Sequence, residues 1–134
     1  MEFNVKAGLV GEKQEKVTEE NTAIKYGSGE VPVFATPALV GLMEGAAIKA
    51  VDSFLPEGFC TVGTNVSITH SAATPLGMTV TCRAELIEAT GRRLLFKVQG
   101  FDEKEAVGEG THERFIVEIK KFMQKNDQKA GKQL

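Results

Sequence analysis

Three polar side chains in this sequence could do chemistry together: a hydroxyl, a carboxylate and an imidazole. Thr36 opens the stretch "TPALVGLMEGAA", Glu44 interrupts its apolar run, and His70 ends the stretch "TVGTNVSITH". Such a set is able to hydrolyse an acyl bond, provided that the fold brings the three groups together.

Glu44 raises the sharpest question, because a lone carboxylate is costly to bury unless it is hydrogen-bonded or protonated. On a helix its surface neighbours lie three and four positions away, and none of them can pair with it; they are Val40, Gly41, Ala47 and Ile48. Two interpretations stay open. Either the side chain reaches water at the margin of the apolar stripe, or the chain keeps it for catalysis.

The other polar residues also have purely structural interpretations. Thr36 precedes Pro37, an arrangement typical of an N-cap followed by the first helical position. His70 ends a strand, where a histidine is often a hydrogen-bonded structural residue. His112 and Arg114 share one face of the last predicted strand, and we expect that face to be solvated at His112.

The elements that position these residues follow from the spacing of apolar side chains. A period of 3.6 predicts a helix from Pro37 to about Phe54, with an apolar stripe formed by Leu39, Leu42, Met43, Ala46, Ala47, Ala50, Val51 and Phe54. A period of two then predicts four strands, within residues 61–70, 77–86, 92–101 and 107–119, paired as an antiparallel meander. An earlier strand is expected near residues 13–18.

These elements predict an α+β domain in which one long central helix is wrapped by a curved antiparallel sheet of about five strands. A single domain over residues 1–122 accounts for the length of the chain. Residues 123–134 are polar and are expected to form a C-terminal tail that frays.

Charge and composition exclude several classes of protein. The net charge of −2 argues against a nucleic-acid partner. No apolar run approaches the ~20 residues of a membrane span, and the N-terminal stretch has no signal-peptide core, so a cytoplasmic location is expected. The chain has two cysteines and two histidines without metal-ligand spacing, so we expect no metal and no cofactor.

Three blocks of the sequence together resemble the hotdog-fold thioesterases of the fluoroacetyl-CoA thioesterase type. The blocks are "VFATPALVGLMEGAA", "TVGTNVSITHSAATPLGMTVT" and "GEGTHERFIVEIKKF", between about Glu30 and Phe122. The resemblance implies a hotdog fold and the hydrolysis of a small acyl-CoA thioester to the free acid and CoA. It also implies roles for specific residues, which are catalysis for Thr36, Glu44 and His70, and substrate contact for Gly63 and Arg114.

The resemblance does not determine the acyl group, since the loop "YGSGEVP" is short of aromatic residues that could form a tight lid. A non-catalytic acyl-CoA or small-ligand binding protein on the same fold is the alternative. A hydratase is disfavoured, because its usual aspartate and histidine on one segment are absent. Open sheet edges predict at least a homodimer with sites built from both chains. In the fold that the resemblance implies, Thr36 and Glu44 would come from one subunit, and His70 from the other or from close to the interface.

Overall fold

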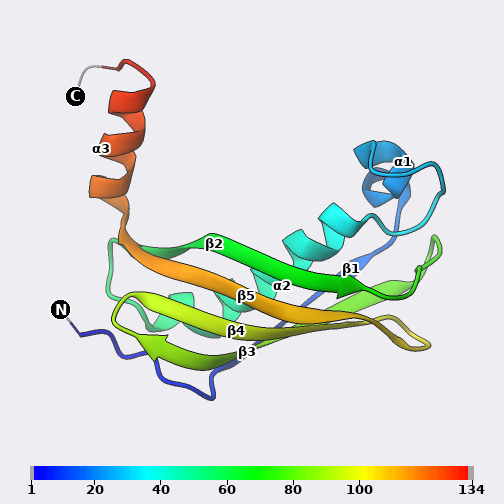
Figure 1. Ribbon diagram of the computed structural model, residues 1–134, viewed down its shortest axis with the longest axis horizontal. Coiled ribbons are helices and arrows are strands. Elements are labelled where there is room, and N and C mark those ends of the chain that lie inside the picture. Colours follow the sequence, from blue (N-terminus) through cyan, green and yellow to red (C-terminus); the bar gives the residue numbers. More distant parts are fainter. Residues whose placement is uncertain (1, 133–134) are drawn as a thin grey trace.

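The structure is a computed structural model that describes residues 2–132, and it consists of one curved sheet with a long helix packed against it (Figure 1). The strands are β1 (Val10–Lys16), β2 (Phe59–His70), β3 (Thr79–Thr90), β4 (Arg93–Phe101) and β5 (Ala106–Glu118). The helices are η1 (Glu19–Asn21), α1 (Ala23–Tyr26), α2 (Thr36–Val51), η2 (Asp52–Phe54) and α3 (Ile119–Lys129). The architecture agrees with the predicted α+β domain.

The order of the strands differs from the predicted meander. The sheet runs β1-β3-β4-β5-β2, and every neighbouring pair is antiparallel. Only β3, β4 and β5 are neighbours both in the sequence and in the sheet. The strand β2 pairs with β5, and β1 pairs with β3. The predicted meander of four consecutive strands was therefore wrong: alternation identifies the buried face of a strand but not its neighbour. As a result β2, which carries Gly63 and His70, lies at a sheet edge.

The long helix α2 packs its apolar stripe against the sheet, chiefly against β1 and β3. The predicted stripe is buried except for Phe54, which is 47% exposed because α2 ends at Val51 and Phe54 belongs to the following turn η2. Gly11 allows the close approach of β1, since a Cβ at this position would overlap the backbone of Ala46 and Ala50. The small side chains on both elements thus bring helix and sheet into direct contact.

The face of the sheet that meets α2 forms the rest of the core. It is apolar on β3 and β4, where the buried side chains are Val80, Cys82, Ala84, Leu86, Leu94, Phe96 and Val98. On β5 the same alternation buries His112, Arg114 and Ile116. The core therefore contains an imidazole and a guanidinium on β5, the strand next to the edge strand β2.

Of the C-terminal tail expected to fray, residues 123–129 are helical, and residues 133–134 lie outside the described residues. α3 spans Ile119–Lys129, buries none of its side chains, and exposes Ile119, Phe122 and Met123. Most of its residues favour helix, which is sufficient to continue the chain beyond β5. Figure 1 shows α3 and α1 extending past β2 at opposite ends of that strand. No helix within residues 2–132 is long and apolar enough to cross a membrane.

Candidate active site

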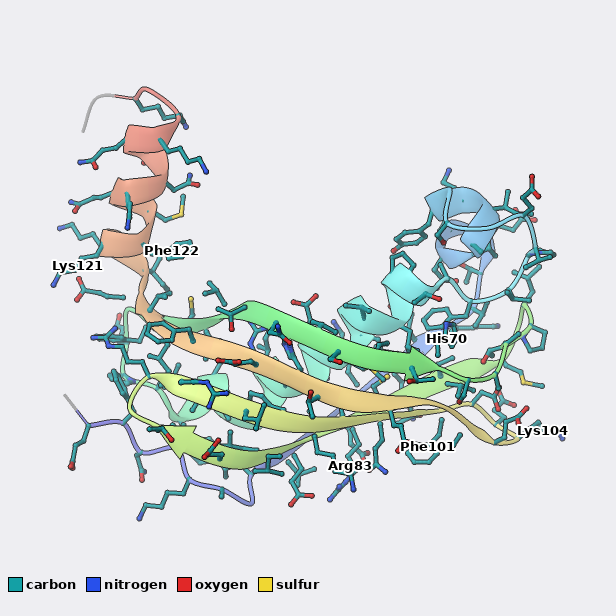
Figure 2. All side chains as sticks on the ribbon, in the orientation of Figure 1. His70, Arg83, Phe101, Lys104, Lys121 and Phe122 are labelled. Carbon is teal, nitrogen blue, oxygen red and sulfur yellow. The ribbon has the colours of Figure 1, made fainter. Side chains whose placement is uncertain are left out.

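Thr36 and His70 form a pair within one chain. The Thr36 Oγ1 lies 2.7 Å from His70 Nδ1. The N-cap of α2 is Ala35 and not Thr36, which is the first helical residue and makes no capping bond. The predicted capping role of Thr36 was therefore wrong, because its hydroxyl is directed to the imidazole. His70 lies at the α1 end of β2, far from α3 with its labelled Lys121 and Phe122 (Figure 2).

A pocket of about 300 Å³ adjoins this pair. Thr36 and His70 form part of its wall. The rest of the wall consists of small or apolar residues that precede α2 or follow β2, which are Ala23, Ser28, Gly29, Val31, Val33, Phe34, Ser71, Ala72 and Ala73. The two predicted catalytic residues thus border a cavity of small-molecule dimensions.

The imidazole of His70 is neutral near pH 7. Burial lowers the pKa of His70 from its ordinary value, and a hydrogen bond with the backbone of Ala72 opposes this effect in part. Within residues 2–132 the buried Nε2 of His70 has no hydrogen-bond partner. A neutral imidazole with one nitrogen bound to a hydroxyl is able to take up or deliver a proton at the other.

Glu44 lies in the middle of α2 and faces a cation from β5. Its Oε2 is 3.7 Å from Arg114 Nη1, and its side chain is 39% exposed whereas that of Arg114 is only 4% exposed. The helix itself offers no partner, as the sequence indicated, but the fold provides one. Gly63 makes room for the carboxylate, because a Cβ there would stand 2.7 Å from Glu44 Oε2.

Arg114 is held by the first part of β2. Its Nε donates to Thr61 Oγ1 and its Nη2 to the Thr61 carbonyl oxygen, both at 2.8 Å. The Thr61 hydroxyl and backbone N–H donate in turn to the two carboxylate oxygens of Asp52, at 2.6 and 3.1 Å. Burial lowers the pKa of Arg114, while Asp52 and Glu44 raise it, and an arginine in such surroundings keeps its charge.

His112 was expected on a solvated face, and this prediction was wrong. The residue is 1% exposed, and its ring lies between Arg114 and the stacked ring of Phe96. The apolar Ile116, four positions further on the same strand face, is the sequence signal that indicates burial. Asp52 and Thr61 were also missed, and no local signal marks them, because their bonds join separate elements.

Two clusters of predicted site residues are therefore distinct in one chain. Thr36 pairs with His70, whereas Glu44 lies beside Gly63 and Arg114. Glu44 follows Thr36 by about two helical turns, which is about 12 Å along the axis of α2. The bond between Thr36 and His70 joins them within one chain. The expected arrangement took Thr36 and Glu44 from one subunit, and His70 from the other or from close to the interface.

The part of the chain that the structure describes contains no group of three His, Cys, Asp or Glu side chains arranged to hold a metal ion. The chemical groups that the two clusters offer are a hydroxyl, an imidazole, a carboxylate, a guanidinium and glycine backbone.

The fold and these groups define a class, the hotdog-fold hydrolases. A solved structure of the fluoroacetyl-CoA thioesterase FlK superposes on this chain with a TM-score of 0.88, at 37% identity, over 94% of this chain and 98% of that one. A thioesterase superfamily member from Thermus thermophilus, described as a hypothetical protein, matches with a TM-score of 0.87 at 27% identity over 94% and 93% of the two chains.

The comparisons of sequence identify the particular family. The family model for fluoroacetyl-CoA-specific thioesterases (FlK) matches residues 17–120. The fluoroacetyl-CoA thioesterase of Streptantibioticus cattleyicolor is 46% identical over 98 residues, which cover 73% of this chain and 70% of the relative. The chain belongs to the fluoroacetyl-CoA-specific thioesterase family and is a thioester hydrolase acting on acyl-CoA. The resemblance and the hotdog fold are thus confirmed, while the roles of individual residues stay predictions.

Proposed function

We propose that this chain hydrolyses a small acyl-CoA thioester at a site completed by a second copy, with Glu44 as base or nucleophile and Thr36 and His70 assisting. One observation carries the proposal. The Thr36–His70 pair and the Glu44–Gly63 cluster are separate in one chain, and both of them border the free edge strand β2. A second copy placed along that edge is the simplest way to unite them.

The edge of β2 is suited to such pairing. Its residues 63–67 are exposed, including Val66 at 37%, and the adjacent flank of α2 exposes Gly41 and Ile48. A symmetric dimer pairs the same surface of both copies, so residue i meets j and j meets i. If two β2 strands pair antiparallel about an axis between Val66 and Ser67, Gly63 and Glu44 come to face the partner's His70. The dimer would then contain two identical sites.

The reaction follows from the groups at such a site. Glu44 either removes a proton from a water molecule that attacks the thioester carbonyl, or attacks the carbonyl itself to form an anhydride that water then cleaves. Either route passes through an oxyanion, for which the backbone N–H of Gly63 is the candidate donor. The C–S bond breaks, His70 protonates the departing CoA thiolate, and Thr36 holds the water or the carboxylate.

This scheme consumes one water and releases the free acid and CoA, so it requires no redox cofactor. Arg114 is the remaining predicted substrate contact, and its burial favours a role beside Glu44. The pocket of about 300 Å³ next to Thr36 and His70 has small side chains, including Gly29 and Ala72, and suits a short acyl group. The relative from Streptantibioticus cattleyicolor and the solved FlK structure are named as fluoroacetyl-CoA thioesterases. Fluoroacetyl-CoA therefore belongs among the candidate substrates, together with acetyl-CoA and propionyl-CoA.

The test is the release of CoA thiol from a panel of acyl-CoAs of increasing chain length, followed with a thiol-reactive dye. Because Cys60 and Cys82 are free thiols, protein without substrate serves as the blank. Turnover is expected on short acyl groups and should decline with chain length. Tight CoA binding without turnover on any substrate would contradict hydrolysis and identify a binding protein on the same fold.

A further inference from the structure

We propose that His112 is a positioning residue of this site. Its neutral imidazole makes hydrogen bonds both to a bulge in β2 and to the guanidinium of Arg114, and thereby fixes the positions of Gly63 and Arg114 relative to Glu44. The inference rests on the proposed function, but it assigns no contact with substrate to His112. It goes beyond the three predicted catalytic residues, because it concerns what holds their surroundings in place.

The first observation is the bulge itself. Along the β2–β5 pair, Gly63 lies opposite Arg114 and Asn65 lies opposite Glu113, so Thr64 is an extra residue on β2. A bulge bends its strand and leaves backbone groups out of the regular ladder, and is often found beside active sites. The bulge therefore determines the direction in which the backbone at Gly63 faces.

Two side-chain hydrogen bonds hold the bulge to β5. The Nδ1 of His112 lies 2.8 Å from the carbonyl oxygen of Asn65, and the hydroxyl of Thr64 donates to the carbonyl oxygen of Glu113 at 3.1 Å. Thr64 is exposed, whereas His112 is buried. The bond from His112 is thus less open to competition with water than the bond from Thr64.

The partners of the imidazole determine where its proton lies. A carbonyl oxygen can only accept, so the hydrogen is on Nδ1. The other nitrogen, Nε2, faces Arg114 Nη1 at 3.1 Å, and a guanidinium nitrogen can only donate. The neutral Nδ1–H tautomer of His112 satisfies both contacts. A protonated ring would direct a second N–H against the guanidinium.

The charges around the ring favour the same state. Its nearest charged group is Arg114 on β5, and the carboxylate of Glu44 on α2 lies beside the same guanidinium. Asp52 in η2 is linked to Arg114 by the hydroxyl of Thr61. The uncharged ring of Phe96 on β4 stacks on the imidazole. Burial lowers the pKa of His112, as does the charge of Arg114, while the bond to Asn65 and the charge of Glu44 act in the opposite direction. The ring is therefore neutral near pH 7.

Arg114 is consequently fixed from two sides. Thr61, which is itself hydrogen-bonded to Asp52, accepts from Nε and Nη2 of Arg114. His112 accepts from Nη1. The second N–H of Nη1 is therefore available to interact with Glu44. Through His112 the position of Arg114 is coupled to the bulge and hence to Gly63. A loss of either bond of His112 would misplace both groups beside Glu44.

The first test does not depend on activity. The chain contains only two histidines, so the ring nitrogens of the ¹⁵N-histidine-labelled protein can be assigned by comparison with His112→Gln. We expect His112 at pH 7.5 to carry hydrogen on Nδ1 and none on Nε2. A ring protonated on Nε2, alone or in addition, would overturn the proposal even if the protein hydrolyses thioesters well.

The second test separates positioning from general stability. His112→Phe keeps the ring but neither bond, and should lower kcat about 10²-fold with KM within a few-fold, the loss typical of a misaligned oxyanion donor. His112→Gln, which can donate to Asn65 and accept from Arg114, should restore most of that loss. His112→Asn reaches Asn65 but not Arg114, and should be intermediate; it also decides the matter if the phenylalanine variant does not fold.

Val80→Ala is the matched control, because it truncates a buried residue of β3 on the same sheet face. It should lower Tm while leaving kcat unchanged. Wild-type kcat in His112→Phe or His112→Asn, or a loss in His112→Gln as large as in His112→Phe, would overturn the proposal. If the wild-type protein hydrolyses no thioester, the proposed function fails, and the tautomer measurement still decides the state of His112.

Discussion

Glu44 is the residue on which hydrolysis depends in the proposed reaction. Glu44→Gln keeps the volume of the side chain but can neither accept the proton nor attack the carbonyl carbon. We expect kcat for thioester hydrolysis to fall at least about 10²-fold, in line with the usual contribution of a general base. Stability should change little, by about 1 kcal/mol or less, because the carboxylate is partly exposed and its partner Arg114 keeps its other bonds.

Glu12→Gln is a suitable control, since Glu12 is an exposed carboxylate on the opposite sheet edge, β1. Both kcat and Tm should match the wild type. Wild-type turnover in a folded Glu44→Gln protein would remove Glu44 from the catalytic groups and make it a surface acid.

The two histidines predict how stability depends on pH. Burial lowers the pKa of His70 and of His112 in the folded protein, whereas both have a pKa near about 6.5 when unfolded. Below that pH the unfolded chain binds protons that the folded chain does not, so the free energy of unfolding falls on acidification. We expect Tm to decrease from pH 7.5 to 5.5, and to decrease less in His112→Gln. An equal decrease in both proteins would contradict this assignment.

At the scale of elements, β1 and α2 approach each other closely at Gly11. Gly11→Ala introduces a Cβ that must displace the backbone of α2 at Ala46 and Ala50. We expect a loss of about 1–3 kcal/mol, as is usual for overpacking, measured by denaturant unfolding. Backbone atoms cannot move aside as a side chain can, so relaxation at this position is limited.

Gly45→Ala tests the same interface without this conflict. A Cβ at Gly45 would meet only the flexible end of Lys13, and alanine favours helix over glycine by up to about 1 kcal/mol. Its stability should equal or exceed that of the wild type. Equal losses in the two variants would show that the backbone contact at Gly11 is not what limits the packing.

At the scale of the whole molecule, the proposed dimer makes a prediction about mixed subunits. Glu44→Gln and His70→Ala are each expected to be inactive. If each site combines Glu44 of one chain with His70 of the other, a mixed dimer has one intact site. Random exchange of an equal mixture should then restore about a quarter of the wild-type activity.

The control replaces His70→Ala by a chain that carries both substitutions. Mixed with Glu44→Gln, it can form no intact site, so no activity should return. A failure of the first mixture to regain activity, with mixed dimers detected by mass spectrometry, would place all three residues in one chain's site and contradict the composite arrangement.

The sequence by itself determined the elements and the faces that they bury. Apolar spacing places the helix within residues 37–54 and the inner faces of the strands, because both periods are local properties of the chain. The three blocks of resemblance determined the family and the candidate residues, since side chains such as Thr36, Glu44 and His70 stand in recognisable sequence surroundings.

Only the tertiary structure decided which groups meet. It assigned the Thr36 hydroxyl to His70 and not to a helix cap, and it provided Arg114 as the cation beside Glu44. It also buried His112 against Arg114 and Phe96. It also placed β2 at an edge of the sheet, and the two clusters lie apart along β2 and α2. Hydrogen bonds and strand pairings between distant segments leave no periodic signal in the sequence. They depend on which strands are neighbours in the sheet, whereas periodicity reflects only local spacing.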